Sequence, residues 1–337
     1  MDKNPVSTMA NIKSMCPTFS IIIPHKDIPN LLMRCLKSIP VSEDVQVIVV
    51  DDNSPDADTY LETYPELSRP YLEFIRTTKG GGAGYARNVG LDHAKGKWLL
   101  FADADDFFVD NAFDMIRSYE NCDADVVYFK KKSVYSDDLN RLSRRNKEIN
   151  VLVDGYIKAG NETELRVRYW VPWGKLIRKE LVDNNNFRFD EVKYSNDQYF
   201  GICVGLAAPK ITADERVLYV VTTREGSLIS GGCMKPHEIE IRAEVCFRSQ
   251  KLLKDRNIFF RPMPFRSHLL LMLKYNKGLC GNYLKKIDEI YPSRSSAMKD
   301  MTEGYMFLIK FGIYCSVFFI IAIGIVKDKY TKLSQVI

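Results

Sequence analysis

The sequence predicts an α/β protein with a mostly parallel central sheet, a helical region after it and an apolar tail helix. Two patterns predict the sheet. Short apolar runs alternate with segments of helical spacing through the first half of the chain, and polar residues follow several of these runs. The composition, 46% hydrophobic and 27% charged over 337 residues, allows a large core and more than one module. We predict an α/β domain over residues 1–230, a basic helical region over 231–304 and an apolar tail over 305–337.

Five apolar runs in the first half are predicted strands, because each is short, rich in β-branched or aromatic residues and bounded by turn residues. They are FSIIIP (19–24), VQVIVVDD (45–52), LEFIRT (72–77), KWLLFA (97–102) and ADVVYF (124–129). After the first run, Leu32, Leu36 and Ile39 recur at helical spacing and predict a helix on the sheet. After the third, a glycine-rich turn leads into a helix that ends near Gly96.

The second half is less regular. Residues 130–160 are polar, basic and weakly periodic, and we predict a variable excursion outside the core. A helix is expected from about Leu176, ended by an asparagine run, and Asp197 is expected to open another helix. The run RVLYVVTTR (216–224) predicts a late strand. Beyond Pro236 the pattern is helical and cationic, most clearly in EIEIRAEVCFRSQKLLK (238–254) and RSHLLLMLKYNKGL (266–279).

Charge is distributed unevenly, and this points to two kinds of partner. Residues 209–337 carry 21 Lys and Arg against 12 Asp and Glu, a net charge of +9, whereas residues 1–208 carry −4. No basic stripe interleaved with aromatic residues is visible, so a negatively charged membrane surface is a better candidate than nucleic acid. The apolar run 311–326 has 16 residues, about 24 Å of helix at ~1.5 Å per residue, against a hydrocarbon core of about 30 Å. Spanning, lying in the interface and packing as a buried soluble helix all remain open for this tail.

The cysteines and the N-terminus suggest where the protein works. Eight cysteines are scattered without a CxxC pair, which suggests reduced thiols in the cytosol and no structural zinc. The first residues contain no uninterrupted apolar core and do not resemble a secretory signal. The α/β domain is therefore expected in the cytoplasm.

An acidic triplet follows the fourth predicted strand, at Asp103, Asp105 and Asp106. Nearby carboxylates repel one another unless a cation or strong hydrogen-bond donors compensate. Alternate side chains at a strand end point the same way, so Asp103 and Asp105 are expected to face a common ligand while Asp106 turns aside or supports them. Carboxylate oxygens suit Mn²⁺ or Mg²⁺. The alternative is an acidic surface turn, but the position directly after a buried strand favours a metal site.

A second pair of carboxylates, Asp51 and Asp52, closes the second predicted strand. The alternatives are a turn that caps its own backbone and a site that accepts a hydrogen bond from a nucleotide base such as uracil. The glycines at 80–84 permit tight turns, and the guanidinium of Arg87 can bind phosphate. Neither the GxGxxG spacing nor the P-loop is present, which argues against dehydrogenases and ordinary nucleoside triphosphatases.

Taken in order, these stretches resemble the bacterial family 2 glycosyltransferases. The resemblance covers roughly residues 19–230 and rests on FSIIIPHKD, VIVVDDNSPD, GAGYARNVGLDHAKGKWLLFADADD, WGKLIRKEL and SNDQYF. It implies a GT-A fold, that is, a Rossmann-like α/β domain, with a nucleotide-sugar donor, a divalent cation and inversion at the anomeric carbon. Two departures stand out: Asn196 precedes Asp197 where many relatives have Glu, and His25 stands where Tyr-Asn often follows the first strand.

The resemblance also implies roles for individual residues. The residues expected to bind the nucleotide sugar are Pro24, Asp51, Asp52, Gly84, Arg87 and Asp103. Asp105 and Asp103 are expected to hold the metal, and Asp197 to act as the catalytic base, although a plain helix N-cap is the alternative for Asp197. Trp173 and Lys175 are expected to bind the acceptor or to serve packing and a helix start.

Together these features predict a hexosyltransferase-type enzyme of polysaccharide biosynthesis at the cytoplasmic face of the cell membrane. It would be held there peripherally or by a single C-terminal anchor, and would move a sugar from a nucleotide sugar, UDP-linked by resemblance, to a lipid-linked or cell-surface polysaccharide acceptor. The alternative is a non-catalytic, membrane-associated protein that binds sugar nucleotides or serves in assembly. The presence of Asp103, Asp105 and Asp197 together disfavours this alternative.

Overall fold

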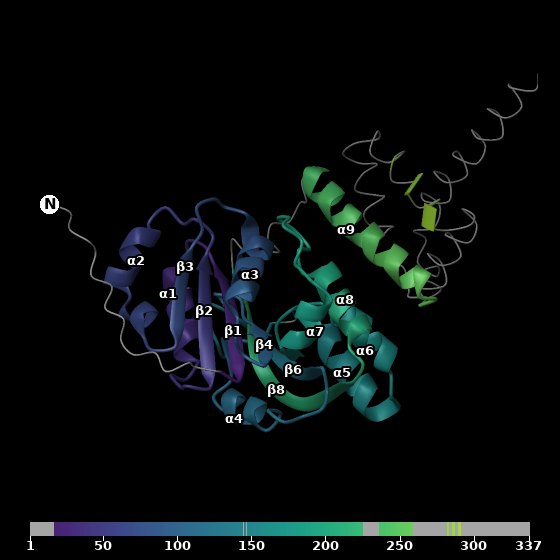
Figure 1. The fold of residues 1–337 in the computed structure, drawn as a ribbon, viewed down its shortest axis with the longest axis horizontal. Helices are drawn as coiled ribbons and strands as arrows, with labels where there is room; N and C mark the ends of the chain where they lie inside the picture. The colour runs from purple at the N-terminus through teal and green to yellow at the C-terminus, as the bar shows by residue number, and fades with distance from the viewer. Residues whose placement is uncertain are drawn as a thin grey trace, which may run out of the picture. The chain divides into compact units, whose positions relative to one another are not determined.

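A computed structural model describes residues 17–143, 145, 147–224, 236–258 and five positions between 282 and 290. The chain divides into two compact units, Met1–Met234 and Lys235–Ile337, and each is described by itself. Over its described residues the first unit has an α/β architecture around a mixed sheet (Figure 1).

Eight strands form this sheet within the described residues, in the order β3-β2-β1-β4-β7-β6-β8-β5. The strands are β1 (Phe19–His25), β2 (Val45–Asp51), β3 (Leu72–Arg76), β4 (Trp98–Phe101), β5 (Phe107–Phe108), β6 (Val126–Tyr135), β7 (Lys175–Arg178) and β8 (Ile211–Thr223). The four strands from β3 to β4 in this order run parallel, as the alternating apolar and helical pattern predicted. Strands β1, β2 and β4 are buried along nearly their whole length, which explains why their sequences are continuous apolar runs.

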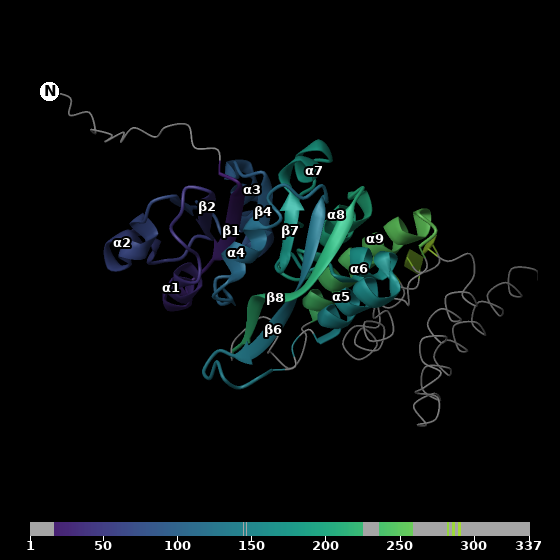
Figure 2. The same ribbon diagram turned by 90° about the horizontal axis from the view of Figure 1, so that it is seen from below.

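The other half of the sheet mixes directions. Strand β7 pairs antiparallel with both β4 and β6, β8 runs parallel to β6, and the short β5 pairs antiparallel with β8. The long β6 and β8 lie side by side along most of their length (Figure 2). The late strand predicted at 216–224 is confirmed within β8.

The prediction of an excursion outside the core over residues 130–160 is wrong. Strand β6 continues to Tyr135, and the helix α5 (Lys147–Ala159) buries Ile149, Leu152 and Val153. Three consecutive lysines, at positions 130–132, interrupt the apolar pattern of this strand. Lys131 is buried, because its ammonium donates hydrogen bonds to Ser133 Oγ at 3.0 Å and to the carbonyl of Arg145 at 2.7 Å. A charged residue with local partners therefore occupies an inward position that the pattern assigned to the surface.

The predicted helix start near Leu176 also needs correction. Residues Lys175–Arg178 form β7, and the helix α7 begins only at Lys179 and ends at Asn184. This four-residue strand lies between β4 and β6 and pairs with both, so tertiary pairing decides its conformation.

Helices pack against both halves of the sheet, the parallel half and the mixed half (Figure 1). Helix α3 packs on β1 and β2, α5 packs on β6 and β8, and α6 packs on α5 and α8. The bounds of these and the remaining helices of this unit are α1 (Pro29–Lys37), α2 (Ala57–Thr63), the 3₁₀ helix η1 (Pro65–Ser68), α3 (Gly82–His93), α4 (Ala112–Arg117), α6 (Glu162–Arg168) and α8 (Gln198–Ala207). Gly90 lets α3 approach the sheet, since a Cβ there would lie 2.4 Å from a methyl group of Ile22.

The second unit is described mainly through one helix, α9 (Pro236–Asp255), which confirms the helical prediction for 238–254. Its buried side chains include Ile239, Cys246 and Leu253. Among the helices that the structure describes, none combines the length and the apolar character needed to cross a membrane. The apolar tail over 305–337 and the predicted helix over 266–279 lie outside the described residues.

Candidate active site

The candidate site lies where the parallel strands β1, β2 and β4 end. His25 at the end of β1 is in register with Asp51 at the end of β2, and the Ala102 amide continues the β4 ladder by donating to the Ile22 carbonyl at 3.1 Å. Pro24 is half-buried within β1, opposite Val50. Since these strands are parallel and adjacent, their polar ends share one edge of the sheet, where open α/β sheets bind ligands.

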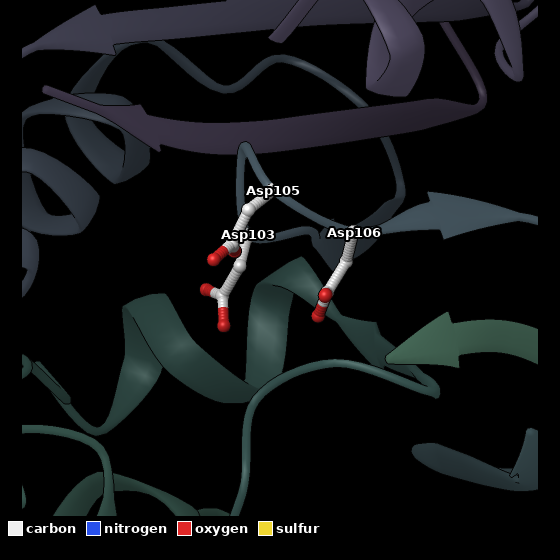
Figure 3. A group of neighbouring side chains, drawn as sticks. All are labelled: Asp103, Asp105 and Asp106. Atoms are coloured by element: carbon white, nitrogen blue, oxygen red, sulfur yellow. The ribbon is translucent and has the colours of Figure 1, made fainter. Parts of the chain in front are cut away.

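The acidic triplet lies on the turn after β4 (Figure 3). One oxygen from each of Asp103, Asp105 and Asp106 lies within 4.8 Å of the others. Asp106 is buried, and its Oδ1 accepts a hydrogen bond from the Thr222 amide at 2.7 Å, whereas Asp103 and Asp105 remain partly open to solvent. Burial, then the charges of Asp105 and Asp103, raise the pKa of Asp106 well above its ordinary value. Asp106 therefore turns aside, as expected, and Asp103 and Asp105 form the accessible pair.

Each carboxylate of this accessible pair contacts an arginine. Arg87 Nη2 donates to Asp103 Oδ1 at 2.6 Å, and Arg224 Nε donates to Asp105 Oδ2 at 2.8 Å. Arg87 comes from α3 and Arg224 directly follows β8, so the two cations reach the cluster from different parts of the fold. Together they offset the repulsion between neighbouring carboxylates.

Helix α3 also holds the loop of residues 187–197, which precedes α8. The side chain of Asn88 brackets Phe189: its Oδ1 accepts from the Phe189 amide at 2.8 Å and its Nδ2 donates to the Phe189 carbonyl at 3.0 Å. Gly84 allows the same loop to come close, because a Cβ there would lie 2.0 Å from the carbonyl oxygen of Asp190. Arg87 Nη1 donates to Asn196 Oδ1 at 2.7 Å. One helix thus fixes a loop about 100 residues further along the chain.

Asp197 occupies the N-cap position of α8 but makes no capping hydrogen bond through its side chain. Burial raises the pKa of its carboxyl above the ordinary value, and the neighbouring Arg87 partly offsets this increase. A carboxylate that is not used for capping and has a raised pKa has the properties of a general base.

The two carboxylates at the end of β2 have different surroundings. Asp51 is fully buried: its Oδ2 contacts His25 Nδ1 at 2.7 Å and accepts from Ser54 Oγ at 2.7 Å, while its Oδ1 accepts from the Ser54 amide at 2.7 Å. Asp52 Oδ1 accepts from the amides of Gly81 and Gly82, at 2.7 and 3.1 Å. Asp51 therefore fixes the loop after β2, and Asp52 fixes the glycine-rich turn that opens α3.

Trp173 and Lys175 lie inside the fold. Trp173 stacks on Tyr219 with ring centroids 5.8 Å apart, and the ammonium of Lys175 donates to the Tyr169 carbonyl at 2.5 Å. Burial lowers the pKa of Lys175 to about 7, and the charge of Asp197 opposes this shift. Both side chains are buried, so the structure gives neither an open surface. A direct acceptor contact for them stays a prediction.

Two contributors were not singled out from the sequence. The hydroxyl of Tyr219 accepts from the Asp103 amide at 2.8 Å and so positions the acidic turn, and Thr222 binds Asp106. Both come from β8, more than 100 residues after the turn they hold. No local signal reports such a contact; only the pairing of β5 with β8 brings the two segments together.

Comparisons with known proteins agree with this geometry. Residues 20–185 match the family described as Glycosyl transferase family 2. The chain is 25% identical over 222 residues to the uncharacterized glycosyltransferase EpsJ of Bacillus subtilis, covering 64% of this chain and 63% of that protein. It is 27% identical over 230 residues to the poly(ribitol-phosphate) β-N-acetylglucosaminyltransferase TarS of Staphylococcus aureus, covering 65% of this chain and 38% of TarS. The matched segment thus spans less than two thirds of either relative.

The fold agrees as well. The crystal structure of S. aureus TarS 1–349 in complex with UDP-GlcNAc superposes with a TM-score of 0.53 and 24% identity, covering 69% of this chain and 66% of that one. This likeness shows that the first unit has a GT-A-like α/β fold, as the resemblance implied. The order of the strands, the site at their carboxyl ends and the family match agree: the first unit is similar in sequence and in fold to the family 2 glycosyltransferases.

Proposed function

We propose that the chain is a metal-dependent, inverting glycosyltransferase that moves a sugar from a UDP-sugar to a saccharide acceptor. The observation that carries the proposal is the position of Arg87. Its guanidinium joins Asp103 of the acidic turn to Asn196, the residue before Asp197. One side chain of α3 thereby connects the residue proposed to bind the sugar donor with the residue next to the proposed base.

The chemistry follows from these positions. In inverting transfer, a base takes the proton of the acceptor hydroxyl while its oxygen attacks the anomeric carbon, and the bond from that carbon to the diphosphate breaks on the opposite face. We assign the base to Asp197. Its raised pKa brings the carboxylate closer to the basicity that proton transfer near neutral pH requires. Inversion then follows from a single displacement with no covalent intermediate.

A divalent cation fits the acidic turn by the chemistry of its oxygens. Asp103 and Asp105 offer carboxylates on neighbouring positions of one turn, with a third acid behind them, and hard oxygen ligands suit Mn²⁺ or Mg²⁺. When bound, such an ion neutralises charge on the departing diphosphate. Asp103 and Asp105 would hold it.

The nucleotide is proposed to lie over the ends of β1 and β2. Asp52 lies there with the glycine-rich turn, whose Gly81 and Gly82 amides donate to its carboxylate, and the neighbouring Asp51 pairs with His25. Gly84 and Pro24 are proposed to allow the nucleotide to approach the backbone closely. Uracil as the base is supported by the fold likeness to TarS, whose structure holds UDP-GlcNAc.

The acceptor is proposed to be a lipid-linked or cell-surface polysaccharide, with the enzyme at the cytoplasmic face of the cell membrane. Three features support this: the net charge of +9 over residues 209–337, the apolar run at 311–326, and the names of two relatives, the poly(ribitol-phosphate) β-N-acetylglucosaminyltransferase TarS and the Rhizobium meliloti succinoglycan biosynthesis protein ExoO. Deleting residues 305–337 should release the protein from the membrane fraction; a truncated protein that still pellets with membranes contradicts this placement.

The decisive test separates binding of the sugar donor from transfer. The Asp197→Asn variant should bind UDP and Mn²⁺ as the wild type does but lose transfer by about 10²–10⁴-fold, because only the base is removed. The Asp105→Asn variant should lose Mn²⁺-dependent binding of UDP. Asp92→Asn on the exposed side of α3 is a matched control that should change neither quantity. Binding is measured by calorimetry, and transfer by release of UDP from a panel of UDP-sugars.

Two results would contradict the assignment. Full transfer activity in Asp197→Asn would show that another group is the base. Binding and transfer that resist chelation of divalent cations, and that survive in Asp105→Asn, would remove the metal from the proposal.

A further inference from the structure

The two accessible carboxylates of the acidic turn are each paired with a guanidinium. Arg87 pairs with Asp103 at 2.6 Å and Arg224 pairs with Asp105 at 2.8 Å. A guanidinium and a divalent cation are attracted by the same carboxylate oxygens, and each positive charge repels the other. A cation that enters this turn therefore meets two charges that oppose it.

The two arginines differ in how firmly they are held. The side chain of Arg87 is 6% exposed, is bound to Asn196 and lies over the ring of Phe189 with its Cζ 5.3 Å from the centroid. The side chain of Arg224 is 29% exposed and stands just past the end of β8. Within the described residues, Asp105 is the polar partner that the structure gives its guanidinium. Arg87 is thus fixed in place, whereas Arg224 can leave Asp105 by turning about its own side-chain bonds.

We propose that Arg224 is a positioning residue that acts as an exchangeable counter-ion of the metal site. It neutralises Asp105 until a divalent cation takes its place, and it then pairs with the diphosphate that enters with the cation. The proposal rests on the function proposed above and adds how this site is regulated: cation and nucleotide bind cooperatively, because the diphosphate offers Arg224 the new anionic partner that it needs.

Thermodynamic linkage makes this cooperativity measurable from either side. If UDP tightens Mn²⁺ binding by some factor, Mn²⁺ must tighten UDP binding by the same factor. Arg224 contributes to this factor in two ways, since it opposes the cation when UDP is absent and attracts the diphosphate when UDP is present. Its removal should therefore change two affinities in opposite directions, which a merely structural ion pair would not do.

The experiment measures three affinities by titration calorimetry on the full chain: Mn²⁺ alone, UDP alone, and UDP at saturating Mn²⁺. In Arg224→Gln we expect Mn²⁺ alone to bind about tenfold more tightly and UDP at saturating Mn²⁺ to bind about tenfold more weakly. Arg224→Lys keeps the charge and should stay within about threefold of the wild type for Mn²⁺ alone. Arg141→Gln is the control: Arg141 is an exposed arginine paired with Asp137, and all three affinities should stay unchanged.

The outcomes separate this inference from the proposed function. If the wild type binds no UDP with or without Mn²⁺, the proposed function fails. If the wild type binds both but Arg224→Gln binds Mn²⁺ alone no more tightly than the wild type, the counter-ion role is wrong. Arg224→Ala provides a second removal of the charge should the Gln variant unfold, and it must show the same pair of opposite changes. Tryptophan fluorescence melts verify that each variant is folded.

Discussion

Replacing Arg87 with Met should destabilise the first unit by roughly 1.5–3 kcal/mol. The substitution keeps an apolar stem of similar length and removes the guanidinium, which pairs with Asp103, donates to Asn196 and lies over the ring of Phe189. It therefore removes three interactions that link the acidic turn to the loop before α8.

The magnitude follows from the burial of each partner. Breaking a fully buried ion pair costs about 3–5 kcal/mol and an exposed one about 0–1. With Arg87 6% and Asp103 26% exposed, a loss of ~2 kcal/mol is appropriate. The bond to Asn196 adds ~1 kcal/mol and the ring contact about 0.5–1. Relief of the desolvated guanidinium, whose buried Nε has no hydrogen-bond partner, offsets about 1–2 kcal/mol of this total.

Urea unfolding followed by tryptophan fluorescence measures this change in the first unit alone, because all three tryptophans, Trp98, Trp170 and Trp173, lie there. With a slope of about 2–3 kcal/mol per molar urea, the midpoint should fall by roughly 1 M. Arg188→Met is the matched control, since Arg188 forms an ion pair with Asp92 at 3.0 Å with its side chain 45% exposed. That variant should lose less than about 0.5 kcal/mol. If the two variants shift equally, Arg87 does not join the two halves of the site.

Three further changes have definite expected outcomes. Lys175 has its ordinary pKa of 10.5 in the unfolded chain and a pKa of about 7 in the folded chain. Between pH 7 and 10.5 the unfolded state therefore holds more protons than the folded state. This lysine makes the free energy of unfolding rise with pH in that window, by at most about 1.4 kcal/mol per pH unit. Urea titrations of wild type and Lys175→Met across this window should differ by that slope, and parallel curves would show that the lysine is not perturbed. Gly84→Ala should reduce transfer at least tenfold by pushing the Asp190 carbonyl away from α3, to be measured as UDP release, whereas a fully active variant would show that the loop tolerates displacement. In the Asn196→Asp variant the new carboxylate should compete with Asp103 for the guanidinium of Arg87 and weaken the Arg87–Asp103 ion pair. Calorimetry should then show several-fold tighter binding of Mn²⁺ in the absence of UDP, and an unchanged affinity would mean that Arg87 does not oppose the cation.

The parallel half of the fold was predictable because three of its four strands, β1, β2 and β4, are buried along nearly their whole length. Continuous apolar runs such as VQVIVV mark such strands directly, and the polar residues that end them mark the ligand edge. The family resemblance added the roles of Asp103, Asp105 and Asp197, which no periodicity could supply. These roles were predicted from ordered motifs, and the structure brings their residues to one edge of the sheet.

The antiparallel half was harder to predict for a physical reason. Lys131 and Lys175 occupy buried positions in strands, where hydrogen bonds to nearby carbonyls and aromatic rings around the ammonium compensate their charges. A pattern of apolar and polar residues assigns such lysines to the surface. Tyr219 was missed for a different reason. Its contact with the Asp103 amide depends on how β8 pairs with distant strands of the sheet, which the local sequence does not show.

Three residues of α3, Gly84, Arg87 and Asn88, connect the acidic turn after β4 with the loop before α8. Asn88 binds the backbone of Phe189 in the loop before α8, Gly84 lets this loop come close, and Arg87 binds the side chain of Asn196. Arg87, one turn from Gly84, then sets the charge at Asp103 from the same helix. Both contacts come from one side chain of α3, so the acidic turn and the residue before Asp197 are tied to the same helix. Arg224 follows β8 and makes its contact from another part of the fold, which is why we propose Arg224, and not Arg87, as the exchangeable charge.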